Sequence, residues 1–142
     1  MIEADGSVQI DAPIEAVFDY LADARNEPQW LPGAQEVGKT SDGPVGLGTR
    51  FEGVYARAGR VALELVEFVP PTRVTFRARV KIADFDDAVT LTERDGGTAL
   101  SARMEAGPRG AMKLFAPPMA RTMRRQFETD WMHLKEALER DA

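Results

Sequence analysis

Apolar and polar residues follow two different rhythms along this chain. From Phe115 to Leu138, large apolar residues recur at steps of three and four, which predicts a helix with one buried face. Between about Gly33 and Ala106, apolar residues alternate with polar ones, which predicts strands that each bury one face. The strands therefore provide an apolar surface against which the terminal helix can pack.

Turn and capping signals divide the chain into elements. Pro13, followed by apolar residues at helical spacing, predicts a short helix, and residues 23–30 predict a second helical turn. Asp95-Gly96-Gly97 is typical of a hairpin turn. Phe68 breaks the alternation of the segment 61–69, which predicts a bulge or a face switch there. The order is one strand, two short helices, six strands and a long helix. This order predicts an α+β fold with an antiparallel sheet, in one domain that covers residues 1–142.

Two consecutive prolines interrupt the helical pattern near its start. Pro117 and Pro118 each lack a backbone donor and clash with a preceding helical turn. They predict a kink or a short lead-in segment that acts as a lid. The alternative is a plain junction between two helical pieces.

Composition narrows the classes of function. The chain has 142 residues without cysteine, which excludes disulfides and thiolate chemistry, and a net charge of −5 argues against nucleic-acid binding. No segment has the pattern of a secretory signal or a membrane span, so we expect a cytoplasmic protein. Basic residues concentrate in the terminal helix, where Arg121, Arg124 and Arg125 lie opposite its apolar stripe. We favour a solvated face there, and transient contact with an anionic membrane is the alternative.

Several stretches resemble one known family. These are Val8–Asp23 (VQIDAPIEAVFDYLAD), Trp30 with Pro32 and Gly33, the segments 46–50 and 67–74, and Leu134–Glu139. Together they are similar to the START-like or SRPBCC superfamily, also called polyketide cyclase/dehydrase-like. The resemblance implies the helix-grip fold, in which a curved seven-stranded antiparallel sheet surrounds a long C-terminal helix, with two short helices after the first strand. It also implies a deep apolar pocket between sheet and helix.

Residues with acid–base or metal-binding chemistry are few. His133 is the only histidine and lies off the apolar stripe, so we expect it to be exposed or structural. Asp84, Asp86 and Asp87 do not predict a metal site, because strand alternation sends Asp87 to the opposite face. No phosphate-binding loop is present in the sequence. We therefore expect neither a metal nor another cofactor.

Asp87 and Tyr55 are the two candidate catalytic residues. Asp87 shares its face with Phe85 and Val89, so an aspartate there would be desolvated and able to act as a general acid or base. We favour the alternative that the strand's register is shifted and Asp87 is solvated. Tyr55 could orient a ligand oxygen, although core packing with its hydroxyl on the backbone is an equal alternative.

The strand parities and the terminal helix also predict a ligand-binding set. Aromatic and methionine side chains suit such a surface because they are large or adaptable. The set is Trp30, Phe51, Tyr55, Leu63, Phe76, Phe85, Met104, Met119, Met123 and Phe127. The terminal helix contributes shape to this set, and we expect no chemistry from it.

Three functions fit these patterns. The leading hypothesis is binding or transport of a small hydrophobic ligand, such as a lipid, a polyketide or another aromatic compound. The alternative is a cyclase or dehydratase that uses acid–base residues in the same pocket. A third possibility is a membrane-associated assembly factor that docks through its basic helix. The sequence leaves the identity of the ligand and the oligomeric state open.

Overall fold

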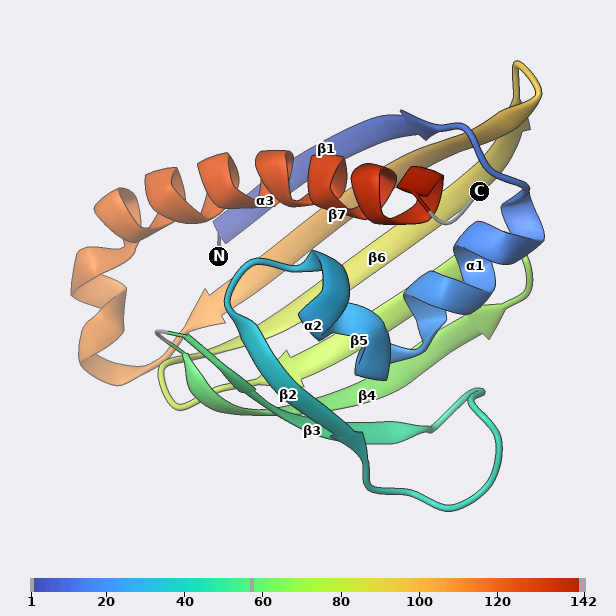
Figure 1. Cartoon of the computed structure of the whole chain (residues 1–142). Helices are drawn as coiled ribbons and strands as arrows, with labels where there is room; N and C mark the ends of the chain where they lie inside the picture. Colours follow the sequence, from blue (N-terminus) through green and yellow to red (C-terminus); the bar gives the residue numbers. More distant parts are fainter. Residues whose placement is uncertain (1, 57, 141–142) are drawn as a thin grey trace.

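Seven antiparallel strands and the long helix α3 form the frame of the molecule (Figure 1). The computed structural model describes residues 2–56 and 58–140. The strands are β1 (Ile2–Ile10), β2 (Ala34–Lys39), β3 (Arg50–Tyr55), β4 (Gly59–Val69), β5 (Arg73–Arg79), β6 (Ala83–Arg94) and β7 (Gly97–Pro108). The helices are α1 (Ile14–Ala22), the 3₁₀ turn η1 (Ala24–Asn26), α2 (Glu27–Trp30), the 3₁₀ segment η2 (Gly110–Phe115) and α3 (Ala116–Arg140). The predicted α+β helix-grip fold is confirmed.

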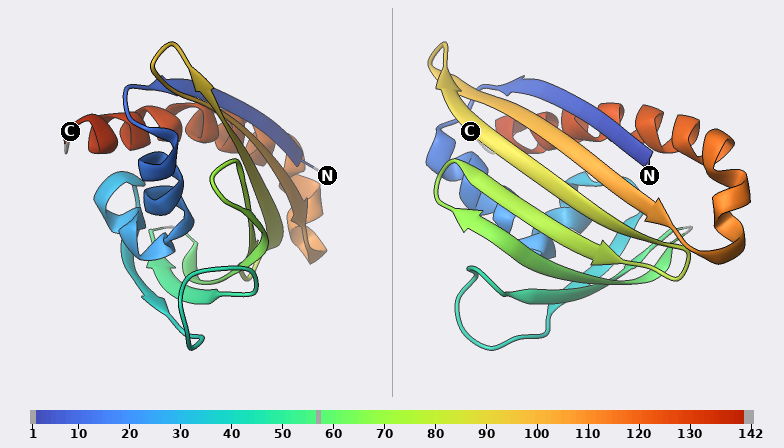
Figure 2. Two further views of the ribbon diagram at one scale, coloured as in Figure 1. Left: turned by 90° about the vertical axis from the view of Figure 1, so that its right-hand side faces the viewer. Right: turned by 180° about the vertical axis from the view of Figure 1, so that it is seen from behind.

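The sheet follows the chain except at its first strand. Its order is β1-β7-β6-β5-β4-β3-β2, so β2 to β7 form a meander and β1 pairs with β7. Figure 2 shows the sheet curving around the helices, which lie on its concave side. Because α1, η1 and α2 connect the two edge strands, they lie across this side of the sheet. The curvature and the short helices leave room between the sheet and α3.

Strand parity in the structure agrees with the sequence pattern. In β7, Leu100, Ala102 and Met104 are buried and alternate with exposed or half-buried polar residues. The β4–β5 register shifts between Leu65 and Glu67, which is the bulge predicted near Phe68. At the β6–β7 hairpin, Asp95 and Gly96 both have positive φ, as a tight turn of this kind requires.

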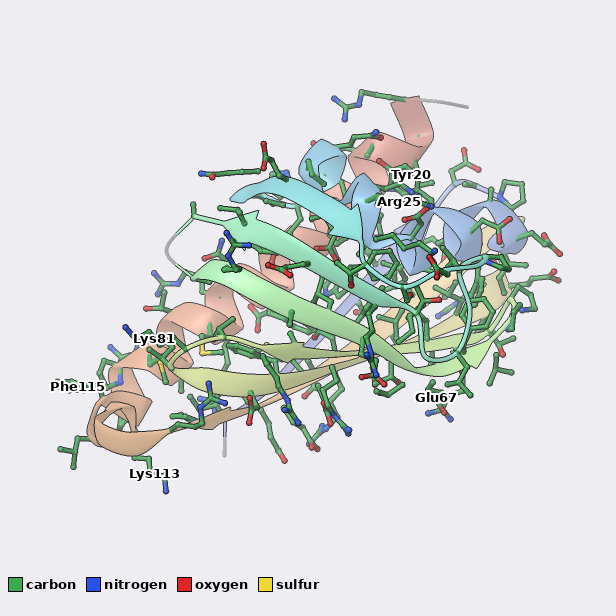
Figure 3. All side chains as sticks on the ribbon, turned by 90° about the horizontal axis from the view of Figure 1, so that it is seen from below. Tyr20, Arg25, Glu67, Lys81, Lys113 and Phe115 are labelled. Atoms are coloured by element: carbon green, nitrogen blue, oxygen red, sulfur yellow. The ribbon has the colours of Figure 1, made fainter. Side chains whose placement is uncertain are left out.

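Helix α3 differs from the expectation at its start. Pro117 and Pro118 lie in its first turn, where backbone N–H groups have no partner within the helix, so two prolines fit without a break. The predicted lead-in segment exists as η2, and the helix itself runs on from Ala116. Phe115 is 56% exposed and lies in η2, so its assignment to the buried stripe was wrong. Figure 3 shows Phe115, Lys113 and Lys81 at the same end of the molecule.

The rest of α3 packs along β1 and against α2. Trp131 lies over Gly6 of β1, and an added Cβ at Gly6 would come within 2.6 Å of the indole. A residue without a side chain is therefore what lets this helix approach the strand so closely. No helix in the described part of the chain is long and apolar enough to cross a membrane.

Candidate functional site

A cavity of about 640 Å³ lies between the concave side of the sheet, α2 and α3. Its volume is within the range of small-molecule sites. Apolar side chains from several strands and both helices make most of its wall. A smaller cavity of about 200 Å³ shares Glu27, Tyr55 and Asp87 with it. Exposed residues at the rim, among them Ala58, Ile82 and Thr122, indicate where the larger cavity meets solvent.

Most of the predicted ligand-binding set lines this space. The members that line the larger cavity are Trp30, Tyr55, Phe76, Phe85, Met104, Met119, Met123 and Phe127. Leu63 lines the smaller cavity instead. Phe51 is not among the described residues that line either one. It is 1% exposed and packs in the core against Phe76, with ring centroids 6.2 Å apart.

Asp87 faces the cavity, so the favoured expectation of a solvated Asp87 was wrong. Strand β6 keeps an unshifted register here, with Phe76 of β5 and Met104 of β7 directly opposite Asp87. Both neighbours are buried, and facing residues in a sheet share one side. Burial raises the pKa of the Asp87 carboxyl to about 7, and the charges of Glu27 and Asp130 add to this effect. Asp87 therefore has the electrostatics of an acid–base group.

Tyr55 and Glu27 form a pair in the same cavity. The Tyr55 hydroxyl donates a short hydrogen bond to Oε1 of Glu27, so the expectation that it bonds to the backbone was wrong. Burial raises the pKa of Glu27 to about 7, although the hydrogen bond from Tyr55 opposes the rise. Burial, together with the Glu27 charge, also raises the pKa of Tyr55. The hydroxyl therefore keeps its proton and fixes the orientation of Glu27.

Helix α3 supplies a third carboxyl, Asp130, to the cavity wall, a position that the sequence expectation did not include. Burial raises the pKa of Asp130 to about 6, while His133 nearby acts in the opposite direction. The sequence signal was available, because Asp130 follows Phe127 by three residues and immediately precedes Trp131. That position lies on the edge of the apolar stripe.

Glu27 was missed for a different reason. An acidic residue in the first turn of α2 has an ordinary explanation, since carboxylates are favourable near the positive end of a helix. Nothing local indicates that the side chain faces the cavity. Its neighbour in space, Tyr55, lies 28 positions further along the chain.

Stacked aromatic rings form the wall beside these carboxyls. Trp30 of α2 and Trp131 of α3 are stacked with ring centroids 5.7 Å apart, and Phe127 meets Trp131 edge to face at 5.5 Å. All three side chains are at least nine-tenths buried. Apolar rings beside the carboxyls contribute to the burial that is the main cause of each raised pKa.

The cluster suits proton transfer better than metal binding. Three carboxyls with pKa values near neutrality can each donate or accept a proton at physiological pH. No group of three or more histidine, aspartate or glutamate side chains able to hold a metal ion occurs in the part of the chain that the structure describes. The cavity therefore offers acid–base groups in an apolar setting.

The other charged candidates lie elsewhere. Asp84 and Asp86 pair with Arg109 and Arg77, and His133 is exposed, as expected. The three helix arginines 121, 124 and 125 are exposed and border a separate surface groove with Ile2 and Glu128. Their contact with a membrane stays a prediction.

Solved structures of similar fold span the whole chain. TTHA0849 from Thermus thermophilus is 15% identical with a TM-score of 0.79, and 99% of each chain is covered. Ara h 8.0201 is 14% identical with a TM-score of 0.72 over 96% of each chain. CV1439 from Chromobacterium violaceum is 21% identical with a TM-score of 0.70, covering 98% of this chain and 99% of that one. At these identities the likeness shows the fold alone.

The comparison of sequences gives the family. No curated protein matches the chain. A family model described as "Polyketide cyclase / dehydrase and lipid transport" matches residues 1–139. The chain therefore belongs to this family, within the START-like superfamily that its sequence resembles.

Proposed function

We propose that this protein binds a small, mainly apolar molecule in the cavity between the sheet and α3. The observation that carries the proposal is the cavity itself, with a volume of about 640 Å³ and mostly apolar walls. Sites that hold small ligands are typically concave and apolar, with a few polar groups that set orientation. The family's description, which includes lipid transport, supports the same class of ligand.

The side chains that line the cavity suit ligands of irregular or variable shape. Met104 of β7 and Met119 and Met123 of α3 line the cavity, and methionine fits irregular partners because its side chain is flexible and polarisable. Trp30 and Trp131, which also line the cavity, are held by stacking. A ligand with a flat or linear apolar body would contact both kinds of side chain.

A neutral fluorescent probe tests the proposal. N-phenyl-1-naphthylamine brightens in apolar surroundings, and we expect saturable binding of one molecule per chain. Both tryptophans of the chain, Trp30 and Trp131, line the cavity, so energy transfer to the probe reports its location directly.

A matched pair of variants makes the test specific. Val89→Phe places extra volume in the cavity and should weaken binding about tenfold or more by overpacking it. Val69→Phe makes the same change at a β4 position that is 48% exposed, and should leave binding unchanged. Absence of saturable binding, or equal binding by Val89→Phe and the wild type, would refute the proposal.

Acid–base catalysis on such a ligand is the second candidate function. The observation in its favour is that Asp87 and the Glu27–Tyr55 pair share the cavity and have pKa values suited to proton transfer at neutral pH. One carboxyl would donate a proton to a ligand carbonyl while another removes a proton from the adjacent carbon.

Turnover of a β-dicarbonyl polyketide mimic tests this candidate. Asp87→Asn should abolish turnover without loss of fold, and Asp86→Asn on the opposite face should preserve it. If the Asp87→Asn variant turns over the mimic as fast as the wild type, catalysis by Asp87 is excluded.

A further inference from the structure

The cavity has a charge imbalance that an apolar ligand does not explain. Its wall includes Glu27, Asp87 and Asp130, which come from α2, β6 and α3. No lysine, arginine or histidine is among the described residues that line it. Buried carboxyl groups are normally paired with a cation or fully hydrogen-bonded, because an unpaired buried charge is costly. Among the described residues, the cavity wall therefore has three acids and no base.

In two of these acids, one carboxyl oxygen has no hydrogen-bond partner among the described residues. Oδ1 of Asp87 and Oδ1 of Asp130 are inaccessible to solvent, and neither has a partner among the described residues. Asp87 is half-buried as a residue and lines the cavity. Glu27 accepts a hydrogen bond from Tyr55 at Oε1, which leaves its other carboxyl oxygen, Oε2, available to a ligand. Unsatisfied buried acceptors of this kind indicate a missing donor.

A protonated amine supplies what the cavity lacks. An ammonium group carries one positive charge and several N–H donors, so it can bond to more than one carboxylate at once. The stacked faces of Trp30 and Trp131 lie in the same wall, and indole faces attract cations. The indole Nε1 of Trp131 also has no partner among the described residues. It lies next to Gly6 of β1, so it does not indicate a ligand in the cavity.

We propose that the ligand of this cavity is an amphiphilic amine, whose protonated nitrogen lies among Asp87, Asp130 and Glu27 while its apolar body lies against the methionine and aromatic walls. This inference rests on the proposed binding function and names the chemical class of the ligand. Neutral and acidic molecules of the same size would leave the carboxyls unpaired and bind less tightly.

Proton release provides a signature of this class. The carboxyls of Glu27, Asp87 and Asp130 hold part of their protons near pH 6.5, because burial raises each pKa. The other groups that act on them are Tyr55 of β3, Asp86 of β6 and His133 of α3. A bound ammonium favours the charged carboxylates and lowers their pKa values, so binding expels protons. At pH 9 the carboxylates are already ionised, and no protons remain to be released.

Three compounds with one skeleton separate charge from hydrophobicity. They are 4-phenylbutylamine, 4-phenylbutan-1-ol and 4-phenylbutanoate, titrated calorimetrically into the wild-type chain in buffers of different ionisation enthalpy. We expect the amine to bind about tenfold or more tightly than the alcohol, and the carboxylate most weakly. We also expect the amine to release about one proton at pH 6.5 and none at pH 9.

Two variants test whether the preference for the amine over the alcohol depends on the carboxyls of Asp87 and Asp130. Asp87→Asn and Asp130→Asn preserve shape but remove charge, so each should reduce the preference for the amine while the alcohol binds as before. Asp86→Asn is the matched control, because Asp86 is the neighbour of Asp87 and pairs with Arg77 on the other side of the sheet. Proton release by the wild type requires no substitution and is therefore independent of how the variants fold.

The outcomes separate this inference from the function on which it rests. If the amine binds no more tightly than the alcohol, or binds without proton release at pH 6.5, the amine proposal is wrong and hydrophobic binding stands. Retention of the full preference by both Asp87→Asn and Asp130→Asn would also overturn it. If neither the three compounds nor N-phenyl-1-naphthylamine binds, both proposals fail together.

Discussion

The two faces of β6 place the same side chain in opposite surroundings. Asp86 lies on the outer face and accepts two hydrogen bonds from the Arg77 guanidinium, at 2.9 and 3.3 Å. Asp87 lies on the inner face, where Oδ1 has no partner among the described residues. The pattern extends beyond this strand, since Arg103 pairs with Glu3 and Asp5 on the outer face. Outside, carboxylates have cations and water; inside, they have each other and aromatic rings.

The contrast between the two faces implies that the cavity reduces the stability of the folded chain. An outer ion pair is solvated and contributes little to folding, because water competes with each partner. An inner carboxyl loses hydration without gaining a partner, which destabilises its charged form. A protein that retains such groups in its interior gives up stability there, and functional sites are where this commonly occurs.

Removal of the aromatic wall should have the largest effect. Trp131→Ala deletes a buried ring that packs on both Trp30 and Phe127, and we expect a loss of about 4 kcal/mol in the free energy of unfolding. Water would then reach Asp130, and its pKa should fall toward the ordinary value. Urea denaturation measures the first effect and ¹³C NMR titration of the carboxyl the second. The control is Met132→Ala, at a residue that is 48% exposed. It should change neither the free energy of unfolding nor the pKa of Asp130.

Neutralising the inner aspartate should stabilise the protein at high pH. The pKa of Asp87 is about 7 in the folded chain, above its ordinary value of 3.8. As pH rises from 4 to 7, the unfolded chain loses this proton before the folded chain does, so the free energy of unfolding falls. Asp87→Asn removes this contribution, and we expect it to be more stable than the wild type by about 2 kcal/mol at pH 8.

Urea denaturation at pH 5 and pH 8 checks the sign. The gain from Asp87→Asn should be larger at pH 8 than at pH 5, because the cost of burying the wild-type carboxyl grows as pH rises from its ordinary pKa of 3.8 to its folded pKa of about 7. Glu27 and Asp130 leave part of the pH dependence in place, since burial also raises their pKa values. A variant less stable than the wild type at pH 8 would contradict this account of the inner face.

Loss of the Tyr55 hydroxyl should have a moderate effect. Tyr55→Phe removes the hydrogen bond to Glu27 and should cost about 1 kcal/mol of stability. Since that bond lowers the pKa of Glu27, its removal should raise this pKa further. ¹³C NMR titration of the Glu27 carboxyl measures the shift. Tyr20→Phe is the control because Tyr20 donates to Gln29, and it should leave the Glu27 titration unchanged.

A substitution on the outer face of β6 should change the stability least. Asp86→Asn breaks the ion pair with Arg77, where both side chains are about half exposed, at 41% and 50%. We expect no measurable shift in the urea midpoint, at either low or high salt, because solvent already weakens the pair. A clear loss of stability would mean that the two faces differ less than their surroundings suggest.

Much of the fold could be predicted because its signals are local. The alternation in β5 and β7, the turn at Asp95 and Gly96, and the bulge beyond Leu65 each depend on residues within one or two strands. Strand parity was also enough to assign Asp87 to the apolar face. The preference for a shifted register was wrong because parity continues unbroken to the start of β6.

The candidate site was predicted less completely. Eight members of the apolar set line the larger cavity, since large side chains on inward positions tend to surround the same space. Phe51 was misplaced because parity gives the face of a strand and not the depth at which a side chain meets the core. Glu27 and Asp130 were missed because each is unremarkable in its own helix.

Periodicity along the chain is enough to assign the inward-facing residues, because it is set by backbone geometry over a few neighbouring residues. The packing of α2, β6 and α3 in three dimensions brings Glu27, Asp87 and Asp130 into one cavity, which no local pattern indicates. Their pKa values follow from that convergence, since desolvation and mutual repulsion depend on neighbours in space. The chain thus specifies an apolar pocket locally, and its fold makes that pocket acidic.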